Sequence, residues 1–236
     1  MSDVEEIWND NARARAEELA NRTDQTYWGL LVPMFEYLVG EITTKERILD
    51  VGCGLGFLTN RMTPFAKFVA GVDISKNSLD YARKNFPQVN EWAHSSIVKY
   101  QAGHEKSFDV CIANMVFHYF DNLDENLKAI GKLLKDGGFL IFAVPHPYFW
   151  YANKRFDGKE QFNFLPDYYV EKSFHVPFRI NNGHALPHKI VYRHRTLETY
   201  IRALYENDFA PLKMREVSLR RDGDPDILFY QCHKIY

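Results

Sequence analysis

Three glycines at alternate positions, preceded by an aspartate, are the residues of this chain whose types and spacing most clearly suggest chemistry. Asp50 ends an apolar run, and Gly52, Gly54 and Gly56 follow it in the stretch D-V-G-C-G-L-G. Glycine permits a positive φ and lets the backbone approach a bound ligand closely. Because such turns after strands are typical of nucleotide sites at the carboxyl edge of a parallel sheet, the pattern predicts a nucleotide-type ligand here.

The carboxylates around the turn restrict which nucleotide fits. A dinucleotide fingerprint has the spacing G-x-G-x-x-G and places a pyrophosphate on a helix N-terminus, whereas the spacing here is G-x-G-x-G. Asp50 beside the turn would repel a pyrophosphate, but it suits a ligand that carries an ammonium group. Asp73, about twenty residues further along, can accept hydrogen bonds from both hydroxyls of a ribose. These residues favour a cationic nucleoside without phosphate.

The elements that must position these residues follow an alternating pattern. Apolar runs typical of strands occupy residues 47–51, 68–74, 90–94, 108–115, 138–144, 212–219 and 226–235. Helix-like stretches separate most of them, and Ser75 and Thr196 stand at the N-cap positions of two of these. The stretch at residues 121–138 is expected to end at its final Asp-Gly-Gly sequence. We predict an α/β fold with a doubly wound, mostly parallel seven-stranded sheet and an antiparallel edge strand.

The whole chain, residues 1–236, is predicted to form a single domain. Residues 1–40 are expected to form an N-terminal helical cap, with Pro33 interrupting its second apolar segment. Residues 145–195 break the alternation and are rich in proline, histidine and aromatic residues. We interpret them as a lid-like insertion after the fifth strand, because long segments of this kind in a compact domain are usually functional.

Composition and charge are those of an ordinary globular protein with many aromatic residues. Of the 236 residues, 46% are hydrophobic, 25% charged and 15% aromatic, and the formal net charge is −2. Since duplex-binding proteins carry a basic excess, we expect no nucleic-acid partner. The three cysteines are expected to be reduced thiols, and no window has the apolar length that a bilayer requires. We expect a cytoplasmic protein without signal peptide or membrane partner, and the oligomeric state stays open.

From about Arg47 to Tyr236 the chain resembles the class I S-adenosylmethionine-dependent methyltransferases, most of all their small-molecule branch. The matching pieces are "ILDVGCGLG", "GVDIS", "FDVCIANMVFHYF" and "AIGKLLKDGGFLIFAVPHP". The resemblance implies S-adenosylmethionine as the cofactor and S-adenosylhomocysteine as its product. It also implies the residues around the cofactor: Asp50 near the methionine amino group, Gly52, Gly54 and Gly56 under the methionine and ribose, Asp73 on the ribose hydroxyls, Ile74 on the adenine, Ser95, Ser96 and Ile97 bordering the adenine, Asn114 and Met115 beside the methionine, and Tyr27 closing the site from the N-terminal side. Many relatives have an acidic residue where Ser96 stands, so the contact to the adenine amine is expected to differ here.

Two histidines follow the predicted fourth and fifth strands, where this family places the methyl acceptor. His118 and His146 are the candidates for a catalytic base because imidazole titrates near neutral pH, and the alternative for each is a structural histidine bonded to the backbone. The fourth strand ends in A-N-M-V, without the two prolines and aromatic residue typical of enzymes that methylate nucleobase amines. Pro187 between His184 and His188 spoils helical ligand spacing, so no metal site is predicted.

The insertion and the N-terminal segment supply candidates for contact with the substrate. Arg179 and Arg193 belong to a basic stretch that could bind a carboxylate or phosphate. Tyr148, Trp150 and Trp28 could form the wall of a pocket for an aromatic substrate. The alternatives are a solvated hairpin for the basic stretch and core packing for the aromatic residues.

The predicted function is methyl transfer from S-adenosylmethionine, by in-line displacement, to an oxygen or nitrogen atom of a small aromatic or anionic metabolite. Three alternatives remain from the sequence. They are an NAD-dependent oxidoreductase on a Rossmann-like sheet, an RNA methyltransferase, and a binding module that has kept the cofactor pocket but lost catalysis.

Overall fold

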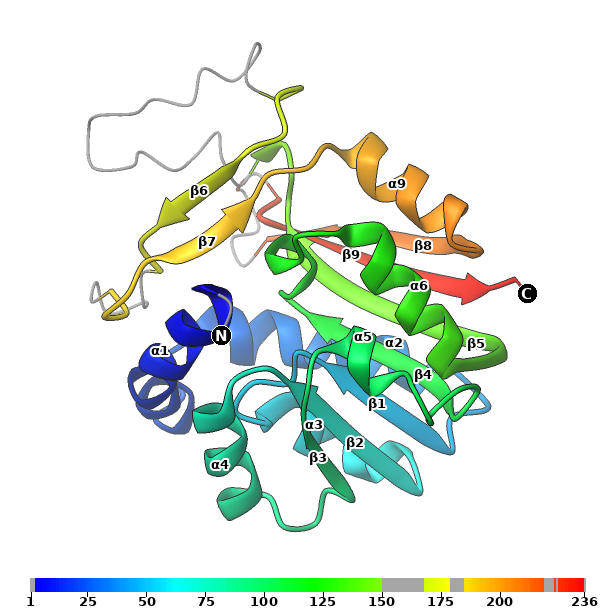
Figure 1. Ribbon diagram of the computed structural model, residues 1–236, viewed down its shortest axis with the longest axis horizontal. Helices are drawn as coiled ribbons and strands as arrows, with labels where there is room; N and C mark the ends of the chain where they lie inside the picture. Colours follow the sequence, from blue (N-terminus) through cyan, green and yellow to red (C-terminus); the bar gives the residue numbers. More distant parts are fainter. Residues whose placement is uncertain (1–2, 150–167, 179–184, 219–222, 224, 236) are drawn as a thin grey trace.

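The computed structural model describes residues 3–149, 168–178, 185–218, 223 and 225–235, and its main sheet has seven strands (Figure 1). The strands in chain order are β1 (Arg47–Val51), β2 (Phe68–Asp73), β3 (Glu91–His94), β4 (Phe108–Asn114), β5 (Leu134–Pro145), β8 (Phe209–Val217) and β9 (Ile227–Lys234). Their order across the sheet is β3-β2-β1-β4-β5-β9-β8. The chain turns back between β1 and β4, so the carboxyl ends of these two strands form the switch point where ligands bind in such sheets.

Strand directions confirm the predicted seven-stranded, mostly parallel sheet. The five strands from β3 to β5 pair in parallel, whereas β9 pairs antiparallel with both β5 and β8. The single antiparallel strand therefore lies second from one edge, and β8 forms the edge itself. This arrangement places β9 between β5 and β8.

One boundary differs from the sequence prediction. The helix expected over residues 121–138 ends at Leu133, and β5 begins at Leu134. Leu134 pairs with Phe108 of β4, and the backbone N–H groups of Lys106 and Ser107 donate to the last carbonyls of the helix. Residues 134–138, which helix propensity alone would place in the helix, therefore belong to a strand because they lie beside β4.

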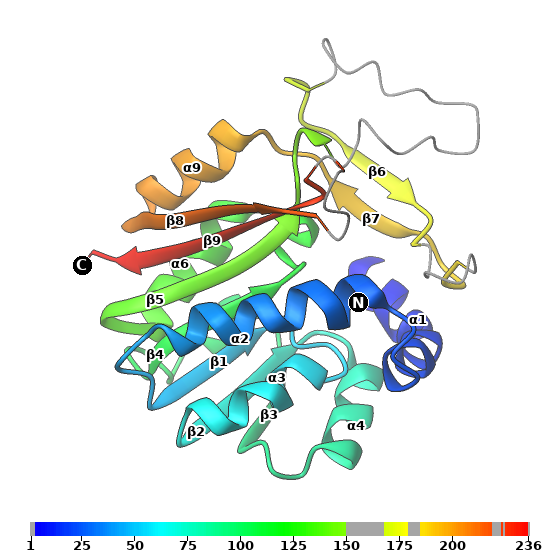
Figure 2. The same cartoon turned by 180° about the vertical axis from the view of Figure 1, so that it is seen from behind.

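Helices cover both faces of the sheet, as the alternation of buried residues requires. The helices α5 (Ile97–Tyr100), α6 (Leu123–Leu133) and α9 (Leu197–Glu206) pack on one face (Figure 1), and α2 (Val32–Gly40), α3 (Phe57–Met62) and α4 (Lys76–Asn85) pack on the other (Figure 2). Side chains alternate along each strand, so Leu49 and Val51 of β1 join the first core while Ile48 joins the second. The predicted caps form: Ser75 accepts from the backbone N–H of Ser78, and Thr196 accepts from Thr199.

The N-terminal helix α1 (Asp3–Ala20) lies at the carboxyl edge of the sheet, beside a hairpin of β6 (Ser173–Val176) and β7 (Ile190–Arg193) (Figure 1). Before Pro33 the chain forms a π-helical turn, η1 (Tyr27–Leu31), and continues into α2 without a break. No helix in the described ranges is long and apolar enough to cross a membrane.

Two asparagines fasten α1 to both sides of this edge. Asn9 accepts from the hydroxyl of Ser75 and from the backbone N–H of Asn77 at the start of α4. Asn11 is fully buried; its side-chain amide donates to the carbonyl of His188 and accepts from the backbone N–H of the same residue, each at 3.0 Å. The helix therefore bridges the β2 side of the sheet and the hairpin.

Asn11→Ala is expected to lower the free energy of unfolding by about 1–3 kcal/mol, because it leaves a partly buried backbone N–H and carbonyl without partners. Urea denaturation measures the change. Arg13→Ala is the matched control, since Arg13 lies on the same helix and its side chain is 92% exposed. Equal losses in the two variants would show that the clasp between α1 and the hairpin does not stabilise the fold.

Candidate functional site

A cavity of about 1290 Å³ lies at the switch point, between the carboxyl edge of the sheet, α1 and the β6–β7 hairpin. All the residues proposed to bind the cofactor line this one cavity: Tyr27, Asp50, Gly52, Gly54, Gly56, Asp73, Ile74, Ser95, Ser96, Ile97, Asn114 and Met115. His118 lines it as well. The fold therefore brings together residues from the N-terminal segment and from the ends of four strands.

The glycine turn leaves room for a ligand directly above its backbone. Gly54 has φ of +51°, and a Cβ atom at this position would meet nothing within 4 Å. At Gly52, which also has a positive φ, a Cβ atom would instead lie 2.4 Å from Val116. Gly52 thus packs closely within the protein, whereas Gly54 faces open space in the cavity. The turn forms a cradle whose floor is backbone.

Asp73 holds this turn in place. One carboxylate oxygen accepts from the backbone N–H of Gly54 at 2.8 Å, and the other accepts from that of Ser75 at 2.7 Å. Burial raises the pKa of this carboxyl group. Each oxygen keeps a further acceptor site, so the carboxylate can receive the two hydroxyls of a ribose while it ties the turn to β2.

Asp50 has a carboxylate oxygen without a partner. Its side chain is buried, and Oδ2 accepts from the hydroxyl of Thr59 at 2.6 Å, while Oδ1 has no hydrogen-bond partner among the described residues. Burial, together with the charge of Asp73, raises the pKa of Asp50 to about 7. A buried acceptor of this kind is costly unless a ligand supplies a donor. An ammonium group would supply both the donor and the opposite charge.

The chemistry of these residues fits a cationic nucleoside and does not fit a pyrophosphate. Asp50, which is buried, and Asp73, which is half-buried, are two carboxylates beside the same glycine turn. A phosphate group near them would meet two like charges at low dielectric. A ribose diol and a cationic side group would satisfy the same atoms.

The N-terminal wall contains charged residues that the sequence analysis did not select. Arg15 forms ion pairs with Glu18 and with Asp24, the second at 2.7 Å, and all three side chains line the cavity. Asp24 also accepts from the backbone N–H of Tyr27 at 2.8 Å, at the start of η1. An aspartate three residues before Tyr27 is a helix-capping signal that could have identified this wall.

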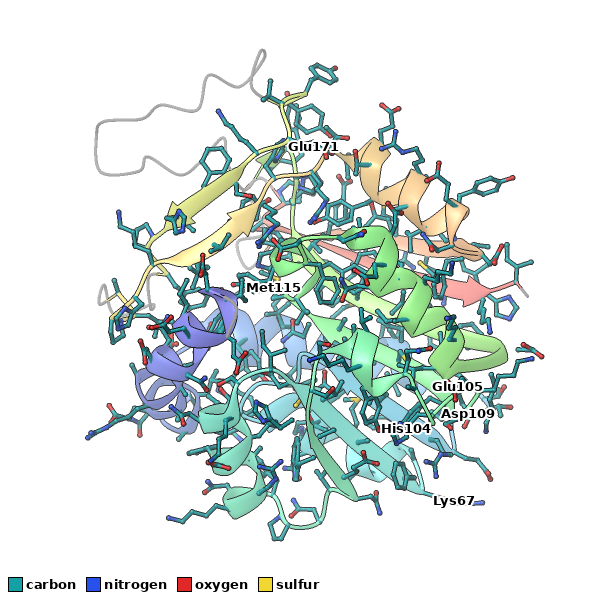
Figure 3. All side chains as sticks on the ribbon, viewed as in Figure 1. Lys67, His104, Glu105, Asp109, Met115 and Glu171 are labelled. Atoms are coloured by element: carbon teal, nitrogen blue, oxygen red, sulfur yellow. The ribbon has the colours of Figure 1, made fainter. Side chains whose placement is uncertain are left out.

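The end of β4 shows local strain at the cavity. Met115, labelled in Figure 3, has φ of +57°, and its backbone N–H donates to the carbonyl of Ala143 at 2.9 Å. The side-chain oxygen of the preceding Asn114 is buried without a partner in the described part of the chain. Positive φ at a non-glycine residue is uncommon and clusters at functional sites. The pair makes the end of β4 a candidate position for contact with a ligand.

His118 follows in η3 (Phe117–Tyr119) and is buried. Its Nδ1 has no hydrogen-bond partner within the described ranges. Burial, with the nearby charges of Arg195 and Arg193, lowers the pKa of His118 to about 3. The imidazole is therefore neutral near pH 7 and offers the cavity one nitrogen donor and one nitrogen acceptor.

Two arginines, Arg193 at the end of β7 and Arg195 just after it, hold the backbone around His118. Arg195 donates to the carbonyl of Phe117 at 3.1 Å, and Arg193 donates to the carbonyl of Tyr119 at 2.8 Å. Arg193 also forms an ion pair with Asp121 and does not line the cavity. Arg193, predicted from the sequence to contact the substrate, therefore binds the backbone of the loop that carries His118.

Three further candidates that the structure describes, His146, Tyr148 and Trp28, do not line the cavity. His146 is buried; its Nε2 lies 2.9 Å from Glu216, and its Nδ1 accepts from the backbone N–H of Tyr148 at 3.1 Å. Tyr148 is 38% exposed, and the indole of Trp28 donates to the carbonyl of Leu19. Two further proposed residues, Trp150 and Arg179, lie outside the described residues.

Comparison with known proteins agrees with this geometry. Residues 49–142 match the family described as a methyltransferase domain. Malonyl-[acyl-carrier protein] O-methyltransferase of Acetivibrio thermocellus is 34% identical over 110 residues, which are 44% of this chain and 38% of that protein. Ubiquinone biosynthesis O-methyltransferase of Aromatoleum aromaticum is 28% identical over 102 residues, which are 42% of this chain and 44% of that protein. The chain thus matches less than half the length of either relative.

Solved structures share the fold at low identity. An S-adenosylmethionine-dependent methyltransferase from Clostridium acetobutylicum superposes with a TM-score of 0.66 at 19% identity, covering 96% of this chain and 98% of that one. The N-methyltransferase NodS from Bradyrhizobium japonicum, in complex with S-adenosyl-L-homocysteine, superposes with a TM-score of 0.63 at 16% identity, covering 96% of this chain and all of that one. These likenesses show that the chain shares its fold with both proteins.

Gly54→Ala is expected to weaken the binding of S-adenosylhomocysteine at least about tenfold, because the added methyl group would enter the cradle and strain the turn. Gly103→Ala is the matched control, since Gly103 also has a positive φ and open space, but lies in the loop before β4 and does not line the cavity. Figure 3 labels its neighbour Glu105 at the opposite end of the sheet from Met115. Isothermal titration measures both affinities, and equal losses would refute the cradle.

The pKa of Asp50 predicts a pH dependence of binding. Raising the pH from 6 to 8 ionises Asp50, so affinity for the ammonium-bearing S-adenosylhomocysteine is expected to rise, by up to about tenfold per pH unit below the pKa of about 7. In the unliganded protein, stability depends on pH in the opposite direction. Because the pKa of Asp50 in the folded protein exceeds the ordinary 3.8, the free energy of unfolding falls as the pH rises between about 4 and 7. Titrations at several pH values test this, and an unchanged pH dependence in Asp50→Asn would contradict it.

Proposed function

Because the chain belongs to the class I S-adenosylmethionine-dependent methyltransferases, we propose that it transfers a methyl group from S-adenosylmethionine to an oxygen atom of a small metabolite. The observation that carries this proposal is the unpartnered Oδ1 of Asp50, in the same cavity as the anchored carboxylate of Asp73. These two groups suit the ammonium and the ribose of that cofactor. A nitrogen atom of a small metabolite is the second acceptor we retain.

The cofactor-binding roles are proposed residue by residue. Asp73 binds the ribose hydroxyls, and Asp50 binds the methionine ammonium group above the backbone of Gly54. The remaining members of the set share a place on the cavity wall, which supports their roles. Ile74, Ser95, Ser96 and Ile97 border the adenine, Asn114, Met115 and Tyr27 lie beside the methionine, and Gly52 and Gly56 shape the turn.

The residues of this chain contribute mainly position and exclusion of water. The bound cofactor supplies an electrophilic methyl carbon, whose bond to sulfur breaks as the bond to the acceptor forms, leaving the electron pair on sulfur. Met115 and His118 border the cavity where β4 ends. Neutral His118 orients an acceptor hydroxyl by accepting its hydrogen bond. Its lowered pKa makes it a weak base, so it receives the proton only as the new bond forms and that proton becomes strongly acidic. His146, whose ring nitrogens both have partners, holds the turn after β5 and stays a prediction as a second base.

Several features favour a small acceptor with an oxygen atom. The two curated relatives are both named as O-methyltransferases. The net charge of −2 disfavours the RNA methyltransferase alternative, and the carboxylates at the glycine turn disfavour NAD.

We further propose one domain over residues 1–236, with residues 1–40 as a cap and residues 145–195 as a lid. Within these segments Trp28, Tyr148, Trp150, Arg179 and Arg193 stay predicted substrate contacts.

Two measurements test the proposal. In isothermal titration, S-adenosylhomocysteine is expected to bind and NADH is not, because a pyrophosphate would face two carboxylates. With methyl-labelled S-adenosylmethionine, a panel of phenols, carboxylic acids and amines is expected to give labelled product from a hydroxyl or carboxyl oxygen. Binding of NADH without S-adenosylhomocysteine would refute the cofactor, and binding without any labelled product would favour a non-catalytic module.

A further inference from the structure

The cavity extends beyond the cofactor residues into a compartment walled by aromatic rings. We define the aromatic chamber by Trp8 of α1, Tyr119 of η3, Phe178 after β6 and Tyr192 of β7, all of which line the cavity. Val176 and Ile190 of the hairpin are buried against these rings. Three separate parts of the chain therefore contribute apolar surface to one compartment, which lies beside His118.

Three of the four rings are arranged edge to face. Trp8 and Tyr119 have centroids 5.5 Å apart with planes at 80°, and Trp8 and Phe178 are 6.4 Å apart at 73°. In this T-shaped geometry aromatic rings attract one another. Tyr192 lies 5.4 Å from the ring of His118, with the two planes tilted by 36°. A planar ring entering the chamber would extend the same cluster.

Three arginines near the chamber, Arg15, Arg193 and Arg195, already have partners in the described part of the chain. Arg15 lies 5.0 Å from the ring of Phe178, and two carboxylates neutralise it. Arg193 and Arg195 bind backbone carbonyls, and Arg193 also pairs with Asp121. An anionic group placed among these rings would lose its hydration without gaining a cation from the described residues.

His118 is the polar group that an uncharged ligand would meet. It is buried beside Tyr119 and Tyr192, it lines the cavity, and its Nδ1 lacks a partner in the described ranges. Buried polar atoms are normally satisfied, so this nitrogen points to a ligand with a matching hydrogen-bonding group. A hydroxyl can act as donor or acceptor and suits a neutral imidazole in either tautomer.

We propose that the methyl acceptor is an uncharged aromatic hydroxyl compound, whose ring packs in the aromatic chamber and whose hydroxyl binds His118. This inference rests on the proposed function and narrows it. It assigns Trp8, Tyr119, Phe178 and Tyr192 to substrate specificity. It disfavours carboxylate acceptors and charged amines.

The first test measures ligand affinity by equilibrium dialysis on the full chain saturated with S-adenosylhomocysteine. The probes are 2-naphthol, its saturated analogue decahydro-2-naphthol, 2-naphthoate and naphthalene. We expect 2-naphthol to bind at least about tenfold tighter than the saturated analogue, because two aromatic pairs together account for such a ratio. We also expect 2-naphthol to bind more tightly than 2-naphthoate and more tightly than naphthalene. Tighter binding of 2-naphthoate, lost in Arg179→Ala, would overturn the proposal in favour of an anionic acceptor.

Variants connect these preferences to individual side chains. Trp8→Leu should abolish the preference for 2-naphthol over its saturated analogue, and Trp8→Phe should keep it. His118→Leu should abolish the preference for 2-naphthol over naphthalene. Tyr205→Leu, which changes a 76% exposed aromatic residue on α9, should leave both preferences intact. Unchanged preferences in Trp8→Leu and His118→Leu would overturn the proposal.

The affinity for S-adenosylhomocysteine, measured on the same samples, distinguishes a failure of the proposed function from a failure of the proposed acceptor. If wild type does not bind S-adenosylhomocysteine, the proposed function itself fails. If it binds S-adenosylhomocysteine but shows no preference for 2-naphthol, only the aromatic hydroxyl acceptor is refuted. Each variant is included only if it retains this affinity, so a folding defect cannot imitate the expected result.

Discussion

Two carboxylates beside one glycine turn, the buried Asp50 and the half-buried Asp73, determine which ligand the site can bind. Asp73 joins the end of β2 to the turn after β1 through the backbone of Gly54, and Asp50 keeps an oxygen unpartnered within the described structure. Burying such groups is unfavourable unless a donor or a positive charge meets them. The cavity is therefore matched to a cationic nucleoside by its electrostatics as well as by its shape.

The N-terminal helix α1 is fastened to both sides of the cavity. Asn9 fastens α1 beside Asp73 through Ser75, and Asn11 fastens it to the hairpin at His188. Trp8, the residue before this pair, reaches the aromatic chamber. A single helix thus links the side of the cavity that contains Asp73 to the aromatic chamber, and it lies over this edge of the sheet.

Local patterns carried most of what could be predicted from the sequence. The glycine turn, Asp50 and Asp73 are recognisable because each follows an apolar run that encodes a strand, and side-chain alternation along those runs predicts the sheet. The contacts of Arg15 with Asp24 and of Arg195 with Phe117 were not predictable, because they depend on how distant segments meet. The end of α6 at Leu133 was missed for the same reason: pairing with β4 overrides local helix propensity.

A crystal structure of the full chain with S-adenosylhomocysteine would show which groups the two carboxylates bind. We expect the ligand's ammonium nitrogen within about 2.7–3.2 Å of Asp50 Oδ1 and its ribose hydroxyls on the carboxylate of Asp73. We also expect its sulfur to face Met115 and to open toward the aromatic chamber. An ammonium group bound elsewhere, with Asp50 Oδ1 still lacking a donor, would refute the proposed role of Asp50.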